Sequence, residues 1–231
     1  MLLSIITPVY NERQTIGELV RRVEAVDFGQ ANVELIIVDD GSTDGTRDIL
    51  KKMLRRHTIL FHEENRGKGA AVRTGLTVAK GDLIVVQDAD LEYDPNDLKL
   101  LLKEIRKGRH HVVYGSRVLG KKRIHYSTFI FHLGGSLVTW WTNFLFGTNL
   151  TDEATCYKMF TRRVLNDITL QANRFEFCPE LTGKAINAGY KIKEVPVSYK
   201  PRSAREGKKI KIRDGLEALW VLTKVKLFNR L

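Results

Sequence analysis

Short apolar runs alternate with amphipathic stretches through the first half of the chain. Runs of this kind predict the buried strands of a parallel sheet. They cover residues 2–7, 33–38, 59–62, 83–86 and 111–114. Between the runs, apolar residues return at helical spacing, as Ile16, Leu19, Val20 and Val23 do. Repeated strand–helix units imply an α/β fold with a Rossmann-like, mostly parallel sheet flanked by helices.

The same alternation returns near the end of the chain. Residues 175–188 are predicted to form a helix that ends at Gly189. Residues 190–197 are predicted to form a strand, and Pro196 indicates that this strand lies near an edge of the sheet. In residues 214–231 apolar side chains alternate with basic ones. This pattern predicts either a terminal helix that docks on the core or a helix that contacts a membrane.

Residues 126–146 interrupt the pattern, because they contain no Asp, Glu, Lys or Arg. By length the stretch could span a bilayer. Its scattered Ser, Thr, His and Asn residues favour helices that lie in the membrane interface, a depth that suits its two tryptophans. Basic residues at 121–123 could contact anionic headgroups. The alternative is a hydrophobic hairpin that packs on the protein's own core or forms a dimer face.

Composition fits one large domain with an ordinary core. The chain has 231 residues, of which 43% are hydrophobic and 28% are charged. Cys156 and Cys178 show no metal or redox spacing, which favours a reduced, cytosolic setting. The first residues run directly into a predicted strand and show no signal-peptide pattern.

The formal net charge of +11 fits nucleic acid, an anionic membrane surface or a polyphosphate substrate. A nucleic-acid binder would need basic residues interleaved with aromatic ones along one face. Here much of the positive charge flanks an acidic segment and the apolar stretch. We therefore expect no nucleic-acid partner.

Carboxylates cluster where the apolar run 83–86 ends. Asp88, Asp90 and Glu92 follow this run, at the position where open α/β sheets bind ligands. On an extended segment, alternate residues point the same way, so three acids would bring their oxygens to one point. Mg²⁺ or Mn²⁺ would relieve their repulsion. The alternative is a polar loop into the next helix, capped by Asp94, with solvated acids.

Polar residues at the ends of the other predicted strands could share one cleft with these acids. Tyr10 could stack on a base, although it could equally be part of the core. Glu12 and Asp40 could accept hydrogen bonds from a base or ribose. Lys68 lies between two glycines in a segment that resembles a phosphate cradle but lacks the full P-loop pattern. No Gly-x-Gly-x-x-Gly follows the first predicted strand, which argues against a dinucleotide-dependent oxidoreductase.

Taken in order, these motifs resemble those of glycosyltransferase family 2. The matching segments are 7–12, 38–44, 65–69, 88–90, 113–117, 151–158 and 194–197. The similarity covers nearly the whole chain and is greatest to the dolichyl- and polyprenyl-phosphate mannose or glucose synthases. In one respect the chain departs from the mannose synthases, which usually have Gln at the position of Glu92.

The resemblance implies a single domain, 1–231, with the GT-A fold. Within it, residues 1–120 would form the nucleotide-sugar-binding half and residues 121–150 an apolar insertion of membrane-interface helices. Residues 151–201 would form the acceptor half. Residues 202–231 would form a basic loop, closing over the diphosphate, and a C-terminal amphipathic helix.

The resemblance also assigns roles to individual residues. Nucleotide-sugar binding falls to Pro8, Tyr10, Glu12, Val38, Asp40, Lys68, Asp88, Ala89, Asp90, Arg117, Arg202 and Lys208. Binding of the metal, Mg²⁺ or Mn²⁺, is assigned to Asp88, Asp90 and Glu92. Catalysis falls to Asp90, Arg117 and Asp152, where Asp152 could orient the sugar hydroxyls or accept a proton.

The implied reaction is inverting transfer of a hexose, with mannose from GDP-mannose preferred, to a polyprenyl (dolichyl-type) phosphate. The alternatives are UDP-glucose as donor, or a soluble or polysaccharide acceptor. A nucleotidyltransferase of similar fold would share the acids but not the basic loop together with the apolar stretch. Many relatives carry transmembrane segments after the region that corresponds to residues 214–231. We therefore expect a cytoplasmic protein attached peripherally to the cytoplasmic face of a membrane, directly or through a membrane-anchoring partner protein.

Overall fold

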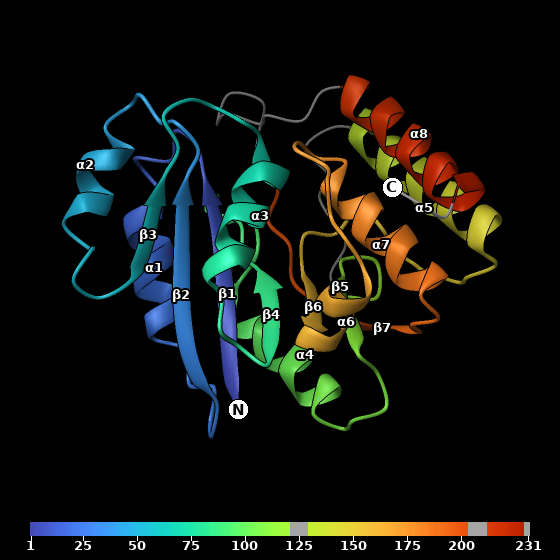
Figure 1. Ribbon diagram of the computed structural model, residues 1–231, viewed down its shortest axis with the longest axis horizontal. Helices are drawn as coiled ribbons and strands as arrows, with labels where there is room; N and C mark the ends of the chain where they lie inside the picture. The colour runs from blue at the N-terminus through green and yellow to red at the C-terminus, as the bar shows by residue number, and fades with distance from the viewer. Residues whose placement is uncertain (121–128, 203–211, 229–231) are drawn as a thin grey trace.

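Seven strands form one mixed sheet in the order β3-β2-β1-β4-β6-β5-β7 (Figure 1). The structure, a computed structural model, describes residues 1–120, 129–202 and 212–228. The strands are β1 (Leu2–Val9), β2 (Asn32–Asp39), β3 (Thr58–Phe61), β4 (Leu83–Val86), β5 (Val112–Ser116), β6 (Lys158–Thr161) and β7 (Ile192–Pro196). Pairing is parallel except where β6 runs antiparallel to β4 and β5. The predicted α/β fold with a mostly parallel sheet is confirmed, and β7 lies at the edge as Pro196 indicated.

Helices cover both faces of the sheet. One face carries α1 (Ile16–Glu24), α2 (Thr46–Lys51) and α4 (Leu98–Ile105), the last preceded by the 3-10 turn η1 (Pro95–Asp97). The other face carries α3 (Lys68–Val78), α6 (Arg162–Asp167) and α7 (Phe177–Asn187). Successive residues of β4 alternate between the two resulting cores: Leu83 and Val85 join one, Ile84 and Val86 the other. Burial on both faces explains why this strand reads as a continuous apolar run.

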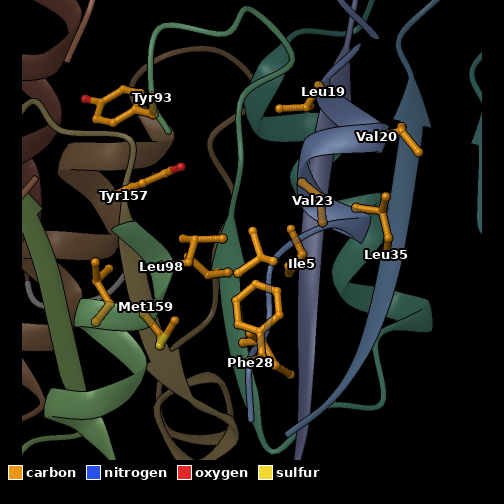
Figure 2. Close-up of a cluster of buried hydrophobic side chains, with 14 of the residues drawn as sticks. Ile5, Leu19, Val20, Val23, Phe28, Leu35, Tyr93, Leu98, Tyr157 and Met159 are labelled. Atoms are coloured by element: carbon orange, nitrogen blue, oxygen red, sulfur yellow. The ribbon is translucent and has the colours of Figure 1, made fainter. Parts of the chain in front are cut away.

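Figure 2 shows the core on the α1 and α4 face. Leu19 and Val23 of α1 and Leu98 of α4 belong to the same buried cluster as Ile5 of β1. The apolar face predicted for α1 is the face that it buries. The helix prediction from spacing is therefore confirmed in both position and orientation.

Two further helices, α5 (Phe129–Phe146) and α8 (Ile212–Phe228), lie side by side outside α7 (Figure 1). They share a small core of Val138, Ala218 and Leu222. The indole Nε1 of Trp141 also donates to Thr223 Oγ1 at 3.0 Å. The terminal helix thus packs on the protein through one face, which is the first of the two predicted alternatives. No helix in the described part of the chain has the length and apolar character needed to cross a membrane.

Strand β6 was not predicted from the sequence pattern. It has four residues and begins at Lys158, a charged residue that is only 1% exposed. Because β6 is antiparallel to β4, the chain that enters it arrives at the carboxyl end of β4. Residues 151–157 are thereby placed beside the acidic segment.

The chain reverses its direction across the sheet at β1. From β1 it proceeds to β2 and β3 on one side, and then returns to β4 on the other side. These strands are parallel, so their carboxyl ends all lie at the same end of the sheet. Such reversal points are where open α/β sheets bind ligands.

Candidate active site

The carboxylates that follow β4 lie on a tight turn. Leu91 has φ 61°, in the left-handed region, and the backbone N–H of Glu92 donates to Asp90 Oδ1 at 3.1 Å. The expectation that Asp88, Asp90 and Glu92 project from an extended segment is therefore wrong. Within the described ranges, no three Asp, Glu, His or Cys side chains are grouped so that they could hold a metal ion.

Each of these acids instead has a partner. Asp88 pairs with Lys68, with oxygen and nitrogen 2.7 Å apart. Asp90 Oδ2 lies 3.4 Å from the Arg202 guanidinium. Glu92 accepts hydrogen bonds from the Tyr199 hydroxyl at 2.6 Å and from the backbone N–H of Arg202 at 2.8 Å.

The described side chains at this point nevertheless carry an excess of negative charge. Burial, together with the charges of Asp88 and Glu92, raises the pKa of Asp90 to about 7. Among the described side chains, the ion pairs of the cluster join four acids, Glu12 included, to two cations, Lys68 and Arg202. An all-oxygen set with excess negative charge fits Mg²⁺ or Mn²⁺ in its chemistry.

Arg202 joins two strand ends that are far apart in sequence. Its guanidinium donates to Glu12, after β1, at 3.0 and 3.1 Å, and it also approaches Asp90, after β4. The backbone N–H of Lys200 donates to the carbonyl of Glu92 at 2.8 Å. The start of the predicted basic loop thus contacts the acids, while Lys208 lies outside the described residues.

The predicted nucleoside-binding residues lie at the carboxyl ends of β1 and β2. Pro8 and Val38 are neighbours in the ladder between these strands. Val38 is 0% exposed, so the structure presents no surface of this residue to a ligand. Tyr10 and Glu12 follow β1, and Glu12 is 6% exposed.

Asp40, which follows β2, organises the loop in front of α3. It accepts the backbone N–H groups of Arg66 at 2.9 Å and Gly67 at 2.8 Å. His62 Nδ1 lies 2.7 Å from Asp40 Oδ1, and its Nε2 lies 2.9 Å from Thr74 Oγ1. Asp40 therefore fixes the loop that presents Lys68, together with His62, whose contribution has no signal in the sequence.

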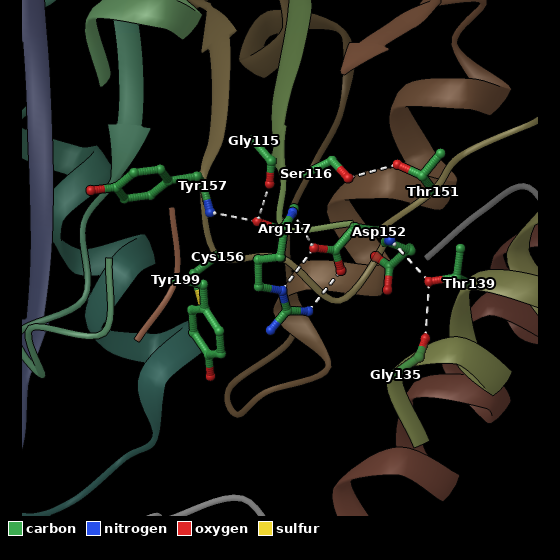
Figure 3. A network of polar contacts seen from close by, with 12 residues as sticks. Gly115, Ser116, Arg117, Gly135, Thr139, Thr151, Asp152, Cys156, Tyr157 and Tyr199 are labelled. Carbon is green, nitrogen blue, oxygen red and sulfur yellow. Dashed lines mark hydrogen bonds and ion pairs between the residues drawn. The ribbon is translucent and has the colours of Figure 1, made fainter. Parts of the chain in front are cut away.

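Arg117 and Asp152 form a two-pronged ion pair on the other side of β4 (Figure 3). Nε donates to Oδ2 at 2.7 Å and Nη2 donates to Oδ1 at 2.6 Å. The backbone N–H of Arg117 adds a third bond at 2.9 Å. Glu194 of β7 accepts the N–H groups of Thr151 and Asp152 at 2.8 and 2.9 Å and fixes this turn. Both oxygens of Asp152 are thus engaged by the arginine.

Behind this turn lies a buried ion pair that the sequence did not reveal. Lys158 Nζ is 2.8 Å from Glu153 Oε1, and each side chain is 1% exposed. The ammonium group also donates to Thr182 Oγ1 at 2.8 Å and lies 4.4 Å from the ring centroid of Tyr114. The pair anchors the start of β6 directly behind Asp152. The only available signal was a lysine at the head of a short apolar run.

Comparison with curated proteins finds relatives that act on polyprenyl phosphates. Dodecaprenyl-phosphate galacturonate synthase of Rhizobium johnstonii is 28% identical over 209 residues, which cover 87% of this chain but only 59% of that protein. Dolichyl-phosphate beta-glucosyltransferase of Trichomonas vaginalis is 30% identical and aligns with 99% of this chain and 74% of its own length. The chain thus spans well under two thirds of the first of these relatives.

Solved structures share the fold. Glucosyl-3-phosphoglycerate synthase of Mycobacterium tuberculosis, solved with Mn²⁺, uridine diphosphate and phosphoglyceric acid, superposes with a TM-score of 0.73. The sequences are 18% identical, and the match covers 98% of this chain and 78% of that one. This likeness identifies the GT-A fold. The sequence profile of glycosyl transferase family 2 matches residues 4–169. The chain belongs to glycosyltransferase family 2.

Proposed function

We propose that this protein is a metal-dependent, inverting glycosyltransferase that moves a hexose from a nucleotide sugar to a polyprenyl phosphate. The observation that carries the proposal is the acid cluster after β4, placed between Arg202 on one side and the Arg117–Asp152 pair on the other. The acids suit a divalent metal ion, Arg202 suits the diphosphate that the ion would hold, and Arg117 suits the phosphate of an acceptor. The named relatives support a polyprenyl phosphate as that acceptor.

The donor side would hold the nucleoside at the ends of β1 and β2 and the diphosphate near the acids. Asp88, Asp90 and Glu92, which the structure does not gather around one point, would come together to hold Mg²⁺ or Mn²⁺, which solved neighbours contain. The ion would supply neutralisation of the charge that develops on the leaving diphosphate. Lys68, Arg202 and Lys208 would add fixed positive charge to the same group. Arg202 would exchange its present carboxylate contacts for phosphate oxygens.

The acceptor side needs no strong base. A phosphate monoester is largely ionised near neutral pH because its second pKa is about 6. The hydrogen bonds from Arg117 to Asp152 fix the guanidinium in place, and we assign Asp152 the role of orienting it. Attack from the face opposite the leaving diphosphate would invert the anomeric centre.

Replacing Arg202 with Ala should weaken binding of the nucleoside diphosphate roughly tenfold, because charge-assisted contacts to phosphate contribute about 1.5–3 kcal/mol each. Lys208→Ala should act in the same direction. Calorimetric titration with the nucleoside diphosphate in Mn²⁺ provides the measurement. Arg213→Ala is the matched control, since Arg213 pairs with Glu217 on the exposed surface of α8. Unchanged affinity in both test variants would remove the basic loop from the donor site.

A membrane surface is the partner that we propose for α5 and α8. Large apolar side chains on the outer surface of both helices are at least 49% exposed. They are Leu133, Leu137, Trp140, Phe144, Leu216, Trp220, Leu227 and Phe228. Two exposed tryptophans among apolar neighbours suit the depth of lipid headgroups. The net charge of +11 favours an anionic surface.

Replacing Trp140 and Phe144 together with Ala should weaken binding to vesicles that contain phosphatidylglycerol by roughly tenfold, because the two exposed rings would no longer be buried in the membrane interface. Vesicle flotation measures this change. Leu100→Ala on α4, where the side chain is 42% exposed, is the control and should bind normally. Unchanged flotation of the double variant, with loss of a dimer in solution, would make these helices a dimer face.

The sugar and the nucleotide are tested directly. The protein is incubated with Mn²⁺, polyprenyl phosphate and a panel of nucleotide sugars, and lipid-extractable products are identified by mass spectrometry. We expect a hexosyl polyprenyl phosphate, with mannose from GDP-mannose as our first choice and glucose from UDP-glucose as the second. If the sugar stays in the aqueous phase on a soluble acceptor, the lipid acceptor is wrong, while membership of the family stands.

A further inference from the structure

Tyr199, just after β7, contacts residues of both the donor side and the acceptor side of the site. Its hydroxyl donates to Glu92 Oε2 at 2.6 Å. The guanidinium carbon of Arg117 lies 5.0 Å from the centroid of its ring. Figure 3 shows the ring beside Arg117, on the side away from Thr139. One side chain thus contacts an acid of the donor side and the arginine of the acceptor side.

Neighbouring aromatic rings hold Tyr199 in this position. Its ring centroid lies 5.1 Å from that of Tyr93, and the two residues form an antiparallel backbone bridge. Tyr93 is 2% exposed and packs in turn on Tyr157, with centroids 4.5 Å apart. The stack therefore runs from the buried core to Arg117, and Figure 2 shows its inner members, Tyr93 and Tyr157. A ring anchored in this way can orient the groups that touch it.

We propose that Tyr199 is a positioning residue that orients Glu92 through its hydroxyl and Arg117 through its ring. The inference rests on the proposed function, because it takes Glu92 as a ligand of the donor's metal and Arg117 as a contact of the acceptor phosphate. A hydrogen bond to a ligating carboxylate fixes its orientation. A flat aromatic face fixes a guanidinium above it. The two actions reside in different atoms and can be separated by substitution.

Two substitutions make this separation. Tyr199→Phe removes only the hydroxyl, whereas Tyr199→Leu removes the hydroxyl and the aromatic face. Titration of the ligand-free protein with Mn²⁺, followed by electron paramagnetic resonance, should show about tenfold weaker binding for both variants. The KM for polyprenyl phosphate should stay at the wild-type value in Tyr199→Phe and rise roughly threefold in Tyr199→Leu.

Tyr157→Phe is the matched control. It also removes a tyrosine hydroxyl from the stack, but that hydroxyl donates to Gln87 Oε1 at 2.6 Å. Its Mn²⁺ affinity should equal that of the wild type, and circular dichroism should report native folding for all three variants.

Each outcome bears on a separate statement. Wild-type Mn²⁺ affinity in Tyr199→Phe overturns the role of the hydroxyl. Equal acceptor KM values in the two Tyr199 variants overturn the role of the ring. A wild-type protein that binds no Mn²⁺ overturns the proposed metal site and the hydroxyl's role with it. A wild-type protein that binds Mn²⁺ but glycosylates no polyprenyl phosphate overturns the proposed function and the ring's role, and leaves the hydroxyl's role standing on the Mn²⁺ titration.

Discussion

Replacing Asp90 with Asn should reduce sugar transfer at least about 100-fold, because removal of one preorganised charge or donor that acts on the transition state commonly costs that much. Asp90 is placed for this role by its position after β4 and by its approach to Arg202 at 3.4 Å. Initial rates at saturating donor and Mn²⁺ provide the measurement. Asp94→Asn is the control, because Asp94 caps η1 through its side chain and Asn caps equally well.

The same variant should fold at least as well as the wild type. The pKa of Asp90 is raised to about 7 in the folded protein. Ionising it therefore destabilises the folded state as the pH rises from about 4 to about 7. Asn carries no such charge, so ligand-free Asp90→Asn should unfold at a higher temperature than the wild type at about pH 8, with the difference shrinking toward about pH 4. Full turnover of the folded variant in the presence of a chelator would contradict the assignment.

Most of the fold followed from local pattern. The apolar runs became β1 to β5, and the spacing in α1 identified the face that it buries. Asp94, which the sequence analysis named as a cap, does cap η1 through its side chain, and Pro95 follows at a position that suits a first turn. These features depend on neighbours in sequence, which is why sequence alone could predict them.

What failed depends on residues that are distant in sequence. Strand β6 has only two apolar residues among its four, and its partners in β4 and β5 define it. The turn at Leu91 was missed because a leucine with positive φ gives no sequence signal. Without that turn, the three acids were expected on an extended segment, and this geometry is wrong.

The site residues were named more successfully than their contacts. Arg117 and Asp152 were both singled out, but nothing in the sequence joins them across 35 positions. Antiparallel β6 makes that contact, because it brings residues 151–157 back to the end of β4. Tyr199 and Glu194 were missed because each acts through a group that touches it only in the folded chain.

Lys158→Met should lower the free energy of unfolding by about 3–5 kcal/mol, because it leaves Glu153 as an unpaired, buried charge. Both side chains are 1% exposed, so water cannot replace the lost ammonium group. The substitution also deprives Thr182 and the Glu153 carbonyl of a donor. The loss of stability should also disturb the active site, because Glu153 is the neighbour of Asp152 in the chain.

Urea unfolding, monitored by circular dichroism, measures this loss against two comparisons. Arg21→Met breaks an ion pair on the exposed face of α1, where the arginine side chain is 69% exposed, and should leave the free energy of unfolding close to that of the wild type. Lys158→Met combined with Glu153→Leu removes both charges and should recover most of the loss, because two apolar groups leave no buried charge unpaired. If Lys158→Met alone lies within about 1 kcal/mol of the wild type, the pair is not the anchor of β6. If the double variant is as unstable as the single one, the cost comes from lost packing and not from the stranded carboxylate.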